Sequence, residues 1–168
     1  MVKYVNFTNK KHLTYIYIIL LLCIFFQDLK ERKVYQIVLL LTIVIGGVLH
    51  YKNTFLELFL NSIMINSVLL VLLLFVLYLY SRFKMHKKFE DTLGLGDVLF
   101  FIALGIGFPT LTFLVLLATS LIFSLLIYLI IKSNLKSKKV PLAGFQALFI
   151  FIILFINLVF NIVNIYTV

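Results

Sequence analysis

Long apolar runs, separated by short gaps that carry most of the charge, constrain this chain more than any other feature. Of its 168 residues, 64% are hydrophobic and 12% are charged. Because soluble domains are roughly 45–50% apolar, this composition indicates an integral membrane protein. In lipid every backbone polar group must be satisfied within the protein, and a long helix does this within one segment. The chain is therefore predicted to be all-α and polytopic.

The apolar runs predict about six transmembrane helices. A span needs about 20 residues, in a range of about 17–25. Pro109 divides one apolar stretch that would otherwise form a helix too long for the bilayer. The predicted helices cover residues 13–27, 34–49, 55–80, 97–108, 110–131 and 142–165. No repeat, linker or second domain is visible, so residues 1–168 are predicted to form a single transmembrane domain.

Charge predicts the orientation of these helices. Eleven of the 15 basic residues lie in the gaps after the first, third and fifth predicted helices. The positive-inside rule places those gaps in the cytoplasm and both termini outside, although the basic N-terminal segment argues weakly for the reverse. The net charge of +9 is thus explained by topology, and we expect membrane lipid rather than nucleic acid as a partner.

Little in the sequence suggests a metal or a cofactor. The single cysteine, Cys23, excludes an intrachain disulfide and a cysteine-based zinc site. The three histidines are scattered along the chain. We therefore expect no metal and no cofactor.

Two aspartates stand at helix ends that face the same side of the membrane. Asp28 follows the first predicted helix, and Asp97 opens the fourth. Two complete spans separate them, and an even number of crossings returns the chain to the same face. With the charge bias, that face is the cytoplasmic one. The helix from Asp97 to Pro109 spans roughly 18 Å. If Pro109 marks the outer interface, Asp97 lies below the cytoplasmic surface, within a hydrocarbon core of about 30 Å.

Ionisable groups at membrane depth are expensive and suggest function. Two carboxylates that face one cavity cannot both ionise easily, so such a pair shares a proton and can activate water against a peptide bond. Gly94 and Gly96, just before Asp97, allow positive φ and the close approach of a substrate strand. The purely structural interpretations are that Asp28 is a solvated helix end and that Asp97 caps its helix.

These residues resemble the type IV prepilin peptidase family of membrane aspartic peptidases. An Asp with an Arg four residues later (Asp28, Arg32), a Gly-x-Gly-Asp motif (94–97) and a proline that leads into the last span (Pro141) occur in that order. The resemblance implies that Asp28 and Asp97 are catalytic. It also implies that the enzyme removes short basic leaders from pilin-like or pseudopilin precursors at the cytoplasmic face of the inner (plasma) membrane.

Some flanking residues depart from the family pattern. Tyr35-Gln36 replaces a common Pro-Asn, and Leu99 replaces a common Lys. The chain lacks the two Cys-x-x-Cys pairs of many members, so it resembles the short, peptidase-only form without methyltransferase activity. We expect Gly94, Gly96 and Arg32 to contribute to substrate binding. The precursor that is cleaved and the oligomeric state are left open.

Two alternative functions would use the same residues. The first is a non-enzymatic membrane component, such as a small transporter subunit or assembly factor, in which the aspartates bind a cation or cap helices. A presenilin-like intramembrane protease is disfavoured by the short chain and by the two spans between the aspartates. Under either main interpretation, Gly46, Gly47, Gly105 and Gly107 are expected to be helix-packing contacts, as small residues often are in spans.

Overall fold

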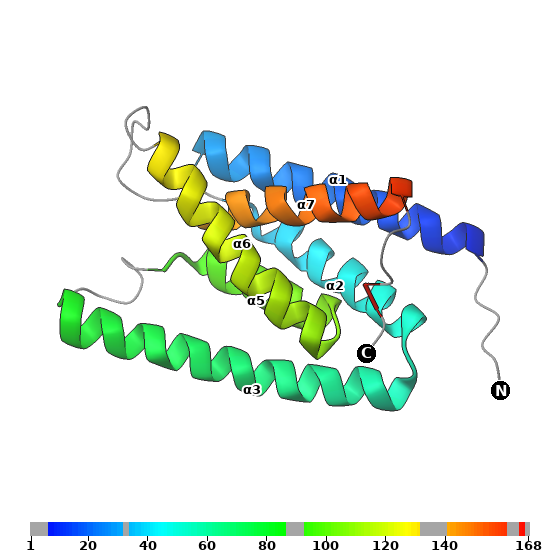
Figure 1. The fold of residues 1–168 in the computed structure, drawn as a ribbon, viewed down its shortest axis with the longest axis horizontal. Coiled ribbons are helices and arrows are strands. Elements are labelled where there is room, and N and C mark those ends of the chain that lie inside the picture. The colour runs from blue at the N-terminus through cyan, green and yellow to red at the C-terminus, as the bar shows by residue number, and fades with distance from the viewer. Residues whose placement is uncertain (1–6, 32–33, 87–92, 132–140, 161–164, 167–168) are drawn as a thin grey trace.

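The computed structural model describes residues 7–31, 34–86, 93–131, 141–160 and 165–166, and these are helical almost throughout, without strands (Figure 1). The elements are α1 (Phe7–Glu31), α2 (Gln36–Asn53), α3 (Leu56–Tyr80), the π-helical turn η1 (Ser81–Met85), α5 (Leu95–Gly107), α6 (Thr110–Ile131) and α7 (Leu142–Phe160). Five of these helices are long and apolar enough to cross a membrane, and the 13-residue α5 is a shorter apolar helix. The predicted all-α, multi-pass architecture is therefore confirmed.

The predicted helix ends differ from the observed ones. α1 continues through Glu31, so Asp28 lies in its last turns rather than after them. Leu29, Lys30 and Glu31 have good helix propensity, which lets the helix run past the apolar stretch. The predicted break at Pro109 is confirmed, because α5 ends at Gly107 and α6 begins at Thr110.

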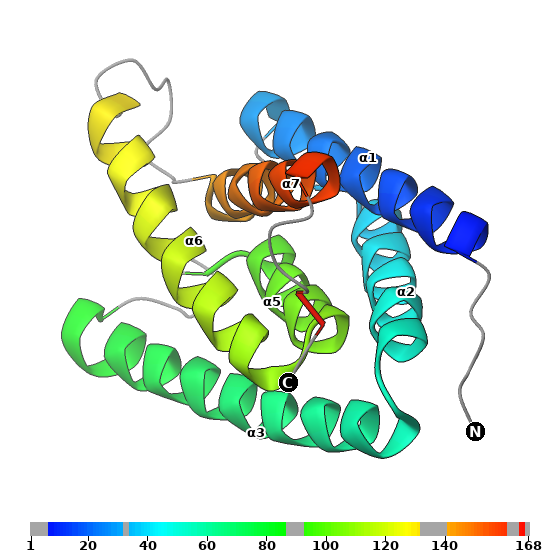
Figure 2. The same cartoon turned by 45° about the vertical axis from the view of Figure 1, so that its right-hand side comes forward.

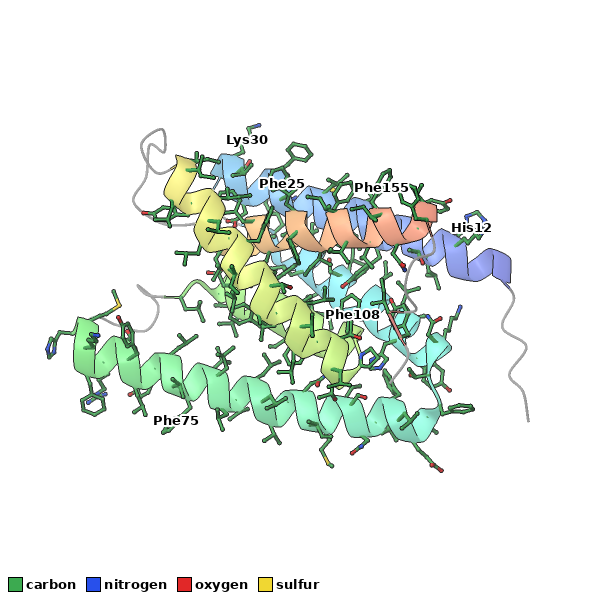
Figure 3. The ribbon with its side chains drawn as sticks, in the orientation of Figure 1. His12, Phe25, Lys30, Phe75, Phe108 and Phe155 are labelled. Atoms are coloured by element: carbon green, nitrogen blue, oxygen red, sulfur yellow. The ribbon has the colours of Figure 1, made fainter. Side chains whose placement is uncertain are left out.

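The short helix α5 lies in the middle of the bundle. It packs against α2, α3, α6 and α7, and Figure 2 shows these four helices around it. Its side chains Phe100, Phe101 and Leu104 are fully or almost fully buried. The long helices instead carry exposed apolar side chains, among them Phe75 and Phe155, as lipid-facing helices do. Figure 3 shows Phe75 pointing away from the bundle and Phe108 within it.

One end of the bundle contains both aspartates and the helix ends that precede the basic gaps. The C-terminal ends of α1, α3 and α6 lie at the end where α2, α5 and α7 begin (Figure 1). The basic gaps follow those C-terminal ends in the sequence. Asp28 and Asp97 belong to this same end of the bundle, as the number of intervening helices predicts.

Glycines let α5 approach its neighbours, as expected. A Cβ added at Gly46 would lie 3.4 Å from the Gly107 Cα and 3.1 Å from the Tyr17 Cε2. A Cβ at Gly105 would lie 2.9 Å from the Leu70 Cδ1. Since lipid provides no hydrophobic force between helices, such close packing carries much of their association.

Substitution of Gly46 by valine is expected to loosen α2 from α5. The new side chain meets the Gly107 backbone, which cannot swing aside, and overpacking of this kind costs about 1–3 kcal/mol. We expect a lower thermal unfolding temperature in detergent. Val44→Leu is the control. Val44 lies on the same helix and is 60% exposed, so this change should leave that temperature unchanged. Equal unfolding temperatures for both variants would contradict the packing role.

Candidate active site

The start of α7 holds both aspartates. The Gly144 N–H donates a hydrogen bond to the Asp28 Oδ2 at 2.7 Å. The preceding amide, the Ala143 N–H, donates to the Asp97 Oδ1 at 2.8 Å. Carboxylates from α1 and α5, which are far apart in the sequence, are therefore brought to two consecutive amides of one helix.

The N-terminal turn of a helix suits such a pair. Its first amides have no partner within the helix, and its dipole favours negative charge. Pro141 directly precedes α7, and its carbonyl oxygen accepts the Phe145 N–H at 3.1 Å, so the amides of Ala143 and Gly144 lie in the first turn. The start of α7 thus supplies directed donors that stabilise negative charge on the carboxylate pair.

A second hydrogen bond fixes the orientation of Asp97. Its Oδ2 accepts the Gly94 N–H at 3.1 Å, while the Gly94 carbonyl oxygen accepts the Asp97 and Val98 amides at 3.1 and 3.2 Å. One carboxylate oxygen therefore caps α5, and the other reaches across to α7. The interpretation of Asp97 as a capping residue is correct for one oxygen and incomplete for the side chain as a whole.

Asp28 is not a solvated helix end. Its side chain is only 8% exposed, among the buried residues of an apolar bundle. Burial of a carboxylate is costly unless it is hydrogen-bonded, and the Gly144 amide provides such a bond. The interpretation of Asp28 as a solvated helix end is therefore wrong.

Gly144 is a site residue that the sequence did not single out as one. A Cβ at this position would lie 2.9 Å from the Asp28 Cβ and 3.0 Å from its Oδ2. Neither atom can move away without moving the carboxylate. The only sequence signal was its place just after the proline that precedes the last helix.

The positive φ expected at the two motif glycines is not observed. No described glycine has positive φ, and Gly94 is extended, with φ −72° and ψ 151°. A Cβ at Gly94 would lie 3.2 Å from the Asp97 Oδ2, so the close approach there is that of the neighbouring carboxylate. At Gly96 a Cβ would meet only Val34, at 4.0 Å. Arg32 lies outside the described residues.

Residues 15–131 match the family model described as the type IV leader peptidase family. The match covers more than half of the chain and includes both aspartates. The start of α7, with its two amides, lies beyond the matched segment. No curated protein and no solved structure matches the chain significantly. In the described part of the chain, no group of three or more His, Cys, Asp or Glu residues is placed to hold a metal ion.

Proposed function

We propose that this chain, which belongs to the type IV leader peptidase family, is an aspartic endopeptidase whose catalytic groups are Asp28 and Asp97. Membership of the family indicates a peptidase of the prepilin type. The observation that supports the catalytic assignment is the pairing of the two carboxylates on consecutive amides of α7.

The proposed chemistry needs one proton shared between the two carboxylates. The ionised group takes a proton from a water molecule, and the protonated group polarises the peptide carbonyl and then protonates the leaving amine. The amides of Ala143 and Gly144 hold both side chains in place throughout, because each donates to one carboxylate oxygen. They also stabilise the negative charge that remains on the pair.

The proposed substrate is a pilin-like or pseudopilin precursor with a short basic leader and an apolar helical stem. The stem would lie among the helices in lipid and present the junction with the leader to Asp28 and Asp97. The basic gaps at this end of the bundle support a cytoplasmic site in the inner (plasma) membrane, by the positive-inside rule. Gly94, Gly96 and Arg32 are proposed to help bind the precursor.

Purified protein in detergent, incubated with a type IV pilin precursor, tests the proposed function. We expect one cleavage, at the junction between the leader and the stem, which mass spectrometry of both products locates. Intact precursor after incubation with folded protein would contradict the proposal and favour a non-enzymatic membrane role.

A leucine at Gly96 is expected to weaken substrate binding. A Cβ at this position would meet only Val34, at 4.0 Å, which is ordinary van der Waals contact, so we expect the variant to fold. If a substrate strand passes close to this turn, the larger side chain raises KM by about tenfold, the loss expected for about 1.4 kcal/mol of binding free energy. Val44→Leu is the control. Kinetics of precursor cleavage measure the effect, and an unchanged KM would remove Gly96 from the binding site.

A further inference from the structure

The C-terminal turn of α5 is held by polar side chains from two other helices. The Asn66 Nδ2 of α3 donates to the carbonyl oxygens of Gly105 and Phe108, at 2.7 and 3.0 Å. The His50 Nδ1 of α2 lies 2.9 Å from the carbonyl oxygen of Ile106. Because a carbonyl only accepts, this nitrogen carries the ring proton. Three carbonyls at the end of α5 are thus bound from outside the helix.

These contacts satisfy carbonyl groups that receive no backbone N–H from the described residues around them. The last carbonyls of a helix lack intrahelical donors, and Pro109, next in the chain, has no N–H to offer. Asn66 and His50 are 1% and 0% exposed, so water does not replace them. Buried carbonyls without a donor are costly, which makes the observed position of α5 the favoured one.

Several small polar side chains in the bundle bond only within one helix in the described structure. Thr42, Ser67 and Thr119 each donate to a carbonyl of their own helix, to Val38, Ile63 and Val115 respectively. Such bonds do not tie one helix to another. Asn66 and His50 reach across to α5, and both act on the same turn.

We propose that Asn66 and His50 are positioning residues that set the depth of α5 and thereby the place of Asp97 against α7. From Gly105 back to Asp97 is about 12 Å along the helix. A slip of one residue would move Asp97 by about 1.5 Å and turn it by about 100°, which breaks its bond to the Ala143 amide. An anchor at one end of this short helix therefore fixes the carboxylate at the other. The catalytic consequence rests on the proposed function.

A pair of cysteines at the site end of α5 reports its position without any substrate. A Cβ at Gly96 lies 4.0 Å from the Val34 Cβ, within the range of about 3.5–4.5 Å that disulfides need. In a Cys23→Ser background, Val34→Cys with Gly96→Cys should form a disulfide on mild oxidation. Adding Asn66→Leu, which is close in shape but has no donor, is expected to lower the disulfide-linked fraction at least threefold.

Matched variants separate positioning from a general loss of structure. Ser67→Ala removes the hydroxyl next in sequence, which bonds only to its own helix, and should leave the disulfide yield unchanged. If Asn66→Leu does not accumulate in the membrane, Asn66→Ser retains one donor and should give an intermediate yield. An unchanged yield in the Asn66 variants would overturn the proposal.

Kinetics in the protein without introduced cysteines provide the second readout. We expect Asn66→Leu to lower kcat for the pilin precursor at least tenfold per folded molecule, with KM within twofold. A merely structural role would lower the amount of folded enzyme and leave kcat per folded molecule unchanged, which would overturn the inference. If the wild-type protein cleaves no precursor, the proposed function fails, while the disulfide yields still decide whether Asn66 positions α5.

Discussion

Replacing Asp97 by asparagine is expected to abolish precursor cleavage. The amide keeps the size of the side chain, and its one oxygen can still accept the Ala143 N–H, so the contact with α7 should remain. The bond from the Gly94 N–H is lost, because the NH2 group that replaces Oδ2 cannot accept it. It cannot take or give the proton that the proposed mechanism requires. A general acid or base typically raises the reaction rate by about 10²–10⁴-fold. We therefore expect kcat to fall by at least about 10³-fold. Cleavage of purified precursor, followed by mass spectrometry, measures this loss.

Asp28→Asn should have an effect of the same size. The double variant should be little worse than either single one, because residues that act as a unit lose activity together. Glu57→Gln, which changes an acid in the first turn of α3, is the control and should cleave normally. Substantial cleavage by Asp97→Asn would exclude the paired-carboxylate mechanism.

Gly144→Ala is expected to be nearly as damaging, although it alters no ionisable group. The new methyl would lie 2.9 Å from the Asp28 Cβ and 3.0 Å from its Oδ2, so the carboxylate or α7 must shift. A misplacement of about 1 Å in a catalytic site can cost about 10²-fold in rate. We expect kcat to fall by about that factor, while the protein still accumulates in the membrane.

The matched control for Gly144→Ala is Gly47→Ala in α2. The added methyl there would lie 3.0 Å from the Ile106 Cγ2, so a neighbour must shift by a few tenths of an ångström, but this contact lies at the end of α5 remote from Asp97. It should retain nearly full activity. Similar kcat values for the two variants would show that the contact between Gly144 and Asp28 does not govern the site.

Hydropathy alone predicted most of the fold. The apolar runs, the break at Pro109 and the packing glycines all appear in the structure, because lipid leaves helices as the natural solution for such runs. The helix ends were less predictable. Residues with good helix propensity carry α1 past its apolar run, and hydropathy does not report this.

The site was predictable only in part. Counting helices placed Asp28 and Asp97 at one end of the bundle, and the structure brings them together. The donors that hold them are backbone amides of Ala143 and Gly144, which have no side-chain signature. The positive φ expected at the motif glycines was wrong, since Gly94 is instead limited by the carboxylate of Asp97.

Asn66 illustrates a different limit. In the sequence it is one polar residue in a long apolar run, and nothing there names its partner. Its two acceptors, the carbonyls of Gly105 and Phe108, exist as free groups only because α5 ends at this point in space. Contacts of this kind depend on how helices pack, which the local sequence does not encode.

Thiol crosslinking between positions 28 and 97 most directly tests the claim that two carboxylates form one site at the start of α7. Cysteines replace both aspartates in a Cys23→Ser background, and a control pair joins position 28 to position 67 on the exposed face of α3. We predict that oxidation or the shortest thiol reagents link 28 to 97 and leave the control pair unlinked. Failure of 28 and 97 to crosslink at any reagent length, in folded protein, would contradict the account.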